Sequence, residues 1–183
     1  MRSLNIPSLE MWMNIKIARD GSFDNIFGEN TRLIAGGSVV EELVVTENIS
    51  GIGAYVFSGY KYLTSVTIDA DIGEIGERAF AECENLESVS ISGRISQIDE
   101  YAFLWCYGLK EATVSGVEVI GAGAFSDCYN LETVVFGDGV EIIKENSFLH
   151  CGNLHNMVIP SSIQNIEGIN NVDFIHDDFL AYY

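Results

Sequence analysis

The chain has 183 residues, enough for one domain or one continuous array of repeats, and 48% of them are hydrophobic, too many for an intrinsically disordered chain. Its 27 acidic residues against 9 basic ones give a formal net charge of −18, which disfavours binding to nucleic acid and to an anionic membrane surface. No uncharged apolar run is long enough for a membrane-spanning helix, so no direct membrane insertion is expected, and the N-terminus lacks the apolar core of a signal peptide.

Residues 1–33 are predicted to precede the regular part of the chain as a strand, a short helix and a loop insertion. The segment Leu4–Ile6 is followed by Pro-Ser, the same pattern that recurs at residues 157–161, so it is predicted to be a strand. Ser8 is placed to act as the N-cap of a short helix over residues 9–13.

An internal repeat of about 23 residues governs residues 34–170, which the chain enters through a predicted hairpin at residues 31–45. The repeat is marked by phenylalanines separated by 23, 23, 22 and 23 residues. Leucine follows each of them after six residues, and apolar residues follow after nine and eleven, with one unit a residue short. The phenylalanines are Phe57, Phe80, Phe103, Phe125 and Phe148.

Each unit contains a Leu-x-x-Val-x-Ile segment, as in Leu63–Ile68, whose alternation predicts a strand with two inward side chains. One unit cannot bury its own apolar face, so the units are predicted to stack into an α/β repeat solenoid. We expect one parallel sheet of about seven short strands, with tight turns or single helical turns on the opposite wall. Residues 171–183 are predicted to form a C-terminal cap, which makes residues 1–183 a single solenoid.

The unit Ala-Phe-x-x-Cys-x-Asn-Leu-x-x-Val-x-Ile, complete from Ala79 to Ile91, resembles the BspA-like leucine-rich repeats of bacterial surface proteins. Nearly all of residues 34–170 follow this pattern. The departures are local: Tyr60 replaces the cysteine of the first unit and Gly108 the asparagine of the third. The resemblance implies a leucine-rich-repeat array at the cell surface or secreted, with a role in adhesion or assembly. Because the sequence shows no signal peptide, a cytoplasmic location is the alternative.

Four cysteines occupy one column, three residues after a phenylalanine, with spacings that match the repeat itself. Ligands on consecutive coils would lie in a line and not at tetrahedral corners, so no metal site is predicted. A ladder of buried thiols is the favoured interpretation, and a disulfide between neighbouring coils is the alternative. The four are Cys83, Cys106, Cys128 and Cys151.

No catalytic constellation is recognisable. His150 and His155 flank Cys151, but no nucleophile has an oriented base and acid at a readable spacing. The stretch Gly121–Ser126 begins like a dinucleotide-binding fingerprint but lacks its third glycine, and it falls on a repeat turn. We therefore expect neither an enzyme nor a cofactor.

Two surfaces are candidates for binding. The first is the outward column of the predicted sheet, where short side chains make a smooth surface of the kind that repeat arrays present to partners. The alternative interpretation is that such residues merely suit strands. The column comprises Val44, Thr67, Ser90, Thr113, Val135 and Val158.

The second candidate surface is aromatic. Trp105, Tyr107 and Tyr129 fall between the core columns, where other units carry mostly polar residues, so they are predicted to point outward on adjacent coils. Exposed Trp and Tyr are enriched at binding hot spots. Partial burial under neighbouring turns is the alternative.

These features favour a protein-binding or adhesive module whose partner is a protein, such as a host or matrix glycoprotein. A carbohydrate-binding module centred on the aromatic residues is a second hypothesis, and a structural spacer within a larger surface protein is a third. The chain is expected to be a monomer or part of a longer array.

Overall fold

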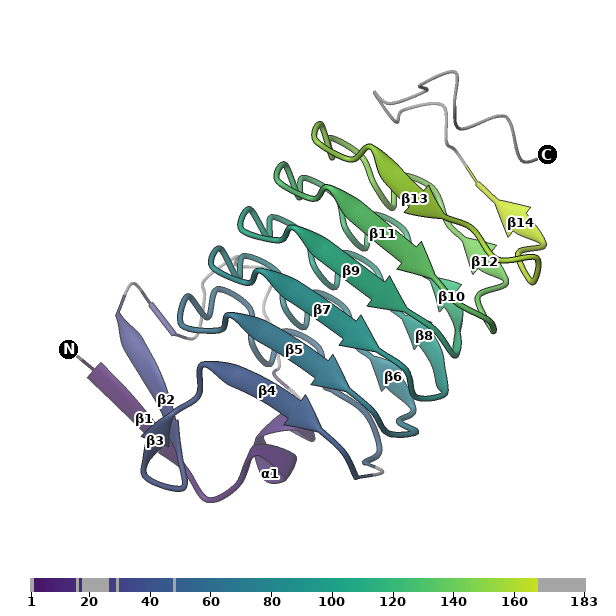
Figure 1. Cartoon of the computed structure of the whole chain (residues 1–183). Helices are drawn as coiled ribbons and strands as arrows, with labels where there is room; N and C mark the ends of the chain where they lie inside the picture. The colour runs from purple at the N-terminus through teal and green to yellow at the C-terminus, as the bar shows by residue number, and fades with distance from the viewer. Residues whose placement is uncertain (1, 16, 18–26, 29, 48, 168–183) are drawn as a thin grey trace.

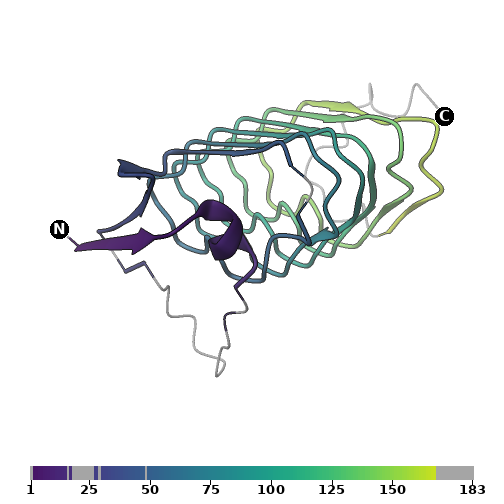
Figure 2. The same cartoon turned by 90° about the horizontal axis from the view of Figure 1, so that it is seen from below.

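The computed structural model describes residues 2–15, 17, 27–28, 30–47 and 49–167, so the predicted cap at 171–183 lies outside the described residues. Within that part the chain is a β-solenoid of about five turns with parallel sheets (Figure 1). Figure 2, seen from below, shows the coils stacked one behind the next as a flattened tube. The solenoid expected from the repeat is therefore confirmed.

The first sheet contains the strands predicted from the Leu-x-x-Val-x-Ile segments. Its six strands are all parallel and each pairs with the strand of the next coil. Their inward Val and Ile side chains are buried, whereas the residues between them are half-buried or exposed. The strands are β4 (Glu42–Val45), β5 (Ser65–Ile68), β7 (Ser88–Ile91), β9 (Glu111–Val114), β11 (Thr133–Phe136) and β13 (Asn156–Val158).

A second parallel sheet lies behind the first, and it was not predicted. The apolar residues that follow each strand of the first sheet, such as Ile95 and Ile98, form a strand of their own instead of a turn, and both side chains are buried although they are three residues apart. Each coil thus contributes two strands. The five strands are β6 (Glu74–Ile75), β8 (Ile95–Ile98), β10 (Val117–Ile120), β12 (Ile142–Ile143) and β14 (Asn165–Ile166).

The prediction of one sheet of about seven strands was wrong at its N-terminal end as well. The strand β1 (Arg2–Ile6) does not join the first sheet but pairs in parallel with β2 (Thr31–Ala35), which pairs antiparallel with β3 (Ser38–Val39). The helix α1 (Leu9–Met13) is present, and the Ser8 hydroxyl accepts a hydrogen bond from the Met11 amide, as expected of an N-cap.

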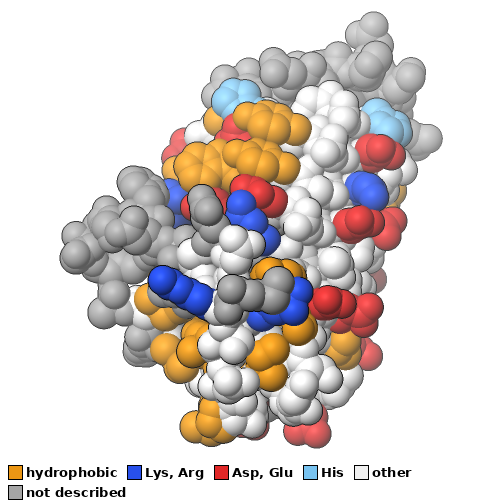
Figure 3. Space-filling view, turned by 90° about the vertical axis from the view of Figure 1, so that its left-hand side faces the viewer, with side chains coloured by type: hydrophobic (Ala, Val, Ile, Leu, Met, Phe, Trp, Pro, Cys, Tyr) orange, Lys and Arg blue, Asp and Glu red, His pale blue; other side chains and the backbone are white. Residues whose placement is uncertain are grey.

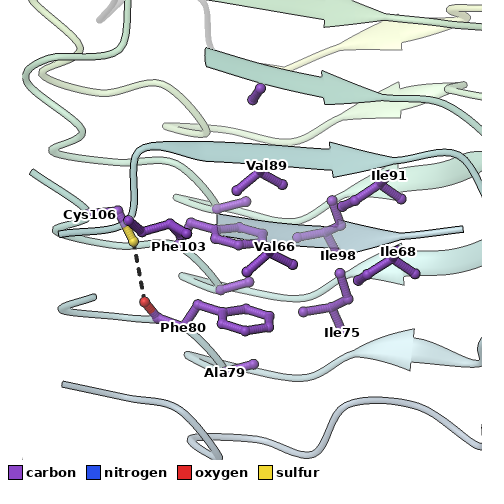
Figure 4. Close-up of a cluster of buried hydrophobic side chains, with 14 of the residues drawn as sticks. Val66, Ile68, Ile75, Ala79, Phe80, Val89, Ile91, Ile98, Phe103 and Cys106 are labelled. Atoms are coloured by element: carbon purple, nitrogen blue, oxygen red, sulfur yellow. Dashed lines mark hydrogen bonds between the residues drawn. The ribbon is translucent and has the colours of Figure 1, made fainter. Parts of the chain in front are cut away.

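The repeat phenylalanines stack along the interior. Successive ring centroids are 5.0–5.4 Å apart and the ring planes deviate by at most 5° from parallel. The residue before each of the last four rings is a buried alanine or serine, which leaves room for the neighbouring coil, and a buried valine, Val56, precedes the first ring. Figure 4 shows Phe80 and Phe103 packed beside the Val and Ile side chains of the two sheets. We call this stack the phenylalanine wall.

The four cysteines are free and buried. Each thiol donates a hydrogen bond to the carbonyl oxygen of the phenylalanine one coil earlier, as Cys106 does to Phe80 at 3.2 Å (Figure 4). Burial raises the pKa of the Cys83 thiol far above its ordinary value, so it stays protonated and able to donate. The thiol ladder favoured by the sequence is therefore confirmed.

The first coil has no phenylalanine before it, and there Tyr60 takes the cysteine position. Its hydroxyl donates to the carbonyl of Val40 at 2.8 Å and accepts from the amide of Leu33 at 3.2 Å. Its ring packs on Phe27 with centroids 4.6 Å apart. The longer side chain thus fills the end of the core and satisfies backbone groups that the repeat pattern would leave unpaired.

The turns that carry the phenylalanine wall have their own hydrogen-bond ladder between coils, although they form no strands. The amide of Phe80, for example, donates to the carbonyl of Ala102, and that of Glu82 to Leu104, both at 2.8 Å. Two positions in each turn have left-handed backbone dihedrals, two residues before and two residues after the phenylalanine. Trp105, with φ of 60°, lies at the second of these positions.

The short repeat unit is accommodated at one corner. Three residues separate β7 from β8, but only two, Ser115 and Gly116, separate β9 from β10. Gly116 has φ of 72°, which lets the backbone make the tighter turn. A Cβ there would lie 2.5 Å from the carbonyl oxygen of Gly93. Both sheets therefore keep their register across the shorter coil.

Candidate functional site

The outward column of the first sheet is aligned as predicted. Residues of successive strands pair in register, and the column runs through the full width of the sheet. Val44 and Val158 at its two ends are 55% and 47% exposed. Ser90 and Thr113 are exposed, and Thr67 and Val135 are half-buried. The result is a narrow surface of small side chains with an apolar residue at each end.

The structure brings together two of the three predicted surface aromatic residues. The rings of Tyr107 and Tyr129 lie parallel, with centroids 5.6 Å apart and an angle of 2° between their planes. Tyr107 is 38% exposed and Tyr129 49%. Trp105 is half-buried on the same turn as Tyr107 and does not extend their stack. We call Tyr107 and Tyr129 the tyrosine pair.

The tyrosine pair is held in place by the turns beneath it. Asn130 donates from its side chain to the carbonyl of Tyr107 at 2.7 Å, which ties the two coils together next to the rings. Asn85 makes the same bond two coils earlier, to the carbonyl of Lys61 at 2.7 Å. The asparagine of the repeat therefore fixes the backbone that presents this column, and Gly108, the departure in the third unit, lacks that bond.

Asp127 connects the tyrosine pair to a histidine. Its carboxylate accepts hydrogen bonds from the Tyr129 hydroxyl at 3.0 Å and from the Ser126 hydroxyl at 2.8 Å, and it lies 2.8 Å from Nδ1 of His150. Partial burial by itself would raise the pKa of Asp127, but these hydrogen bonds outweigh it and hold that pKa below its ordinary value. Asp127 is therefore a fixed negative charge beneath the tyrosine pair.

This cluster does not have the order of a catalytic triad. In a triad, histidine bridges the nucleophile and the carboxylate. Here Ser126 donates directly to Asp127 and is itself buried, whereas His150 contacts only the carboxylate in the bonds described above. The arrangement suits a positioned carboxylate and a presented aromatic surface better than transfer of a proton to a nucleophile.

Further negative charge lies on the coil before the tyrosine pair, at Glu82 and Glu84. Burial, together with the nearby carboxylates of Asp127, Glu84 and Glu82, raises the pKa of Tyr107. The hydrogen bond to Asp127 raises the pKa of Tyr129. One lysine, Lys61, forms an ion pair with Glu84 at 3.1 Å. Figure 3 shows this side of the molecule, where hydrophobic side chains gather next to acidic and histidine side chains.

The column of the tyrosine pair ends in open space. The next residue in that column, one coil later, is Gly152. A Cβ built on Gly152 would meet no atom of the described residues within 4 Å, and its backbone is not left-handed. Since Tyr107 covers one face of the Tyr129 ring, the other face is directed toward this unfilled position. We call that position the open step.

Sequence reasoning missed both the Asp127 cluster and the open step. Gly152 and His150 lie at the mostly polar positions between the core columns, which the sequence predicts only to face solvent. The signal that could have found them is the repeat itself, because residues 22 or 23 apart lie side by side on neighbouring coils. Asp127 and His150 are 23 apart, as are Tyr129 and Gly152.

Two other findings concern the described residues only. No helix among them is long and apolar enough to cross a membrane. In the same part of the chain, no three His, Cys, Asp or Glu residues come together in a way that would hold a metal ion.

Comparison with known structures gives several leucine-rich repeat proteins. A leucine-rich cell surface protein from Faecalibacterium prausnitzii matches with 22% identity and a TM-score of 0.55, over 94% of this chain and 45% of that one. The leucine-rich repeat protein of T. pallidum matches with 20% identity and a TM-score of 0.48, over 65% and 67% of the two chains. No curated protein matches the sequence significantly.

The family model for the BspA type leucine-rich repeat region matches residues 36–154 and 113–170 in six copies. Those ranges contain the whole phenylalanine wall, the cysteine ladder and both candidate surfaces. The match covers well over half of the chain, and the solenoid described above is the fold of its structural neighbour. The chain therefore belongs to the BspA-type leucine-rich repeat family.

Proposed function

We propose that the chain is a protein-interaction module that uses the tyrosine pair as the centre of its binding surface, without catalysis. The observation that supports this is the stack of Tyr107 on Tyr129. Both rings are part-exposed although every phenylalanine of the repeat is buried. Aromatic side chains held rigid by a scaffold lose little conformational entropy on binding, so they suit a hot spot.

A place at the cell surface, with a role in adhesion, fits this proposal. The structural neighbour from Faecalibacterium is described as a cell surface protein. The acidic composition, 27 acidic against 9 basic residues, suits a partner of opposite charge. The partner that we propose is a host or matrix glycoprotein.

The test is binding of the immobilised chain to a panel of matrix glycoproteins and glycans. The site is examined with the triple variant Trp105→Ala, Tyr107→Ala, Tyr129→Ala, and the first sheet with the double variant Ser90→Arg, Thr113→Arg. Saturable protein binding that only the triple variant loses would support the proposal. Loss in the sheet variant alone would move the site to the first sheet.

Two further outcomes would replace the proposal. Binding of a neutral oligosaccharide, lost in the triple variant, would support the carbohydrate-binding alternative, since sugar rings also stack on tyrosine. Absence of binding to every member of the panel would favour a spacer within a larger surface protein.

A further inference from the structure

We propose that the open step receives an arginine side chain of the protein partner, with its guanidinium group stacked on the free face of Tyr129. This inference rests on the proposed function and names the chemistry that the site recognises. It starts from the geometry of the column in which Tyr107, Tyr129 and Gly152 follow one another on successive coils.

The first argument is shape. Neighbouring coils are about one strand spacing apart, roughly 4.8 Å, which is also close to the distance between stacked planar groups. The column is filled by rings at two coils and by no side chain at Gly152, where 4 Å around a Cβ position contains none of the described atoms. A flat group from outside would continue the stack without displacing any described residue.

The second argument is charge. The carboxylate of Asp127 accepts the hydroxyl of Tyr129, the ring next to the open step, whereas Glu82 and Glu84 lie farther away, on the coil before Tyr107. Lys61 is paired with Glu84, and it is the one lysine in the ion pairs of this cluster. A flat group that enters the open step therefore gains from carrying positive charge.

Arginine meets both conditions. Its guanidinium is planar, stacks on aromatic faces, stays charged and is more weakly hydrated than an ammonium group. Lysine would supply the charge but not the plane, and a sugar or aromatic ring would supply the plane but not the charge. The combination of an open ring face with the nearby Asp127 carboxylate favours arginine over each of these.

The direct test uses three blocked peptides of glycine and serine that carry three arginines, three lysines or three citrullines at the same positions. Citrulline keeps the shape of arginine without its charge. Amide chemical shifts of the labelled protein are followed by NMR during titration with each peptide. We expect saturable shifts at Tyr129 and Gly152 with the arginine peptide, weaker binding of the lysine peptide, and no saturable binding of the citrulline peptide.

Two variants test the position. Gly152→Tyr should fill the open step and continue the stack, and its backbone conformation and free space allow the side chain. Tyr129→Leu should remove the ring. Each variant is expected to bind the arginine peptide with about tenfold lower affinity than the unaltered chain. Gln164→Tyr, which adds a ring at an exposed site beside the second sheet, is the matched control and should bind as the unaltered chain does.

The inference would be overturned by equal binding of the citrulline peptide, by shifts that spare Tyr129 and Gly152, or by unchanged binding in Gly152→Tyr. A neutral oligosaccharide that shifts the same residues while the arginine peptide does not would point to a glycan instead. If a protein partner from the panel binds the Gly152→Tyr variant with the same affinity as the unaltered chain, the proposed protein binding stands and the proposed arginine contact is wrong. If no protein binds at all, the proposed function fails independently of the peptide result.

Discussion

The phenylalanine wall and the tyrosine pair are two aromatic stacks built by the same 22- or 23-residue repeat. In the wall, five rings follow one another at 5.0–5.4 Å and all are buried. In the pair, two rings lie 5.6 Å apart, part-exposed, and the stack stops at a glycine. The buried rings recur on every coil and stabilise the core. The part-exposed rings occur on only two coils, so they add little to stability and are available for recognition.

The largest expected effect separates the two stacks directly. Phe103→Ala should lower the free energy of unfolding by about 3–5 kcal/mol, because it removes a ring between two others and leaves a cavity. Tyr129→Ala, which removes a ring of similar size from the surface, should cost less than about 1 kcal/mol. Urea unfolding followed by circular dichroism measures both. Similar losses in the two variants would contradict the division between core and surface.

A second prediction concerns the end of the wall, where Tyr60 replaces cysteine. Tyr60→Phe keeps the ring but removes the hydroxyl that donates to Val40 and accepts from Leu33. Leaving those buried backbone groups unpaired should cost about 1–3 kcal/mol. Thermal unfolding of Tyr60→Phe and of Tyr62→Phe, which alters a half-buried neighbour, compares the two. An equally small effect in both would mean that Tyr60 acts through its ring alone.

A matched pair of glycines sharpens the comparison further. Gly123 has φ of 62° and a Cβ there would lie 2.5 Å from the Tyr101 ring, so Gly123→Ala should cost about 1–2 kcal/mol. Gly152→Ala meets open space and should instead stabilise the chain by about 0.4–1 kcal/mol, because it restricts the unfolded chain. Chemical denaturation measures both, and a loss of stability in Gly152→Ala would show that the open step is filled.

The smallest effect depends on pH. Asp127 has a pKa below its ordinary value of 3.8, so its carboxylate stabilises the fold above that pH, and the contribution is lost as pH falls through the lowered pKa. Asp127→Asn should therefore cost about 1 kcal/mol at neutral pH. The difference from the unaltered chain should stay constant down to roughly pH 5 and shrink below about pH 4. Unfolding curves between pH 3 and pH 7 provide the measurement, and a constant difference throughout would contradict it.

Periodicity was sufficient to predict the first sheet, the phenylalanine wall and the cysteine ladder, because each depends on residues that recur at a fixed spacing. The second sheet was missed because three of its strands contain only two residues and the two longer ones bury their first and last residues instead of alternating. The pairing of β1 with β2 was missed because the pattern of Leu4–Ile6 resembles that of a repeat strand. Its partner strand, β2, lies outside the first sheet. Local pattern predicts a strand, and only the packed structure identifies its partner.

The candidate site shows the same limit. The sequence indicated that Tyr107 and Tyr129 point outward, since they fall between core columns. It did not indicate that their rings stack or that Trp105 lies outside the stack, because these depend on side-chain rotamers and on the left-handed turn at Trp105. The contact between Asp127 and His150 joins neighbouring coils, which the repeat spacing allows but does not require.

The two-residue corner at Ser115 and Gly116 has a consequence for how such arrays change length. A residue lost inside a strand would shift every later side chain of that strand to the opposite face and disrupt the core. Lost at the corner, it leaves Val117 opposite Ile95 and Glu111 opposite Ser88, so both ladders stay in phase. Corners of this kind are therefore where insertions and deletions can accumulate without erasing the alignment between coils on which any surface of the array depends.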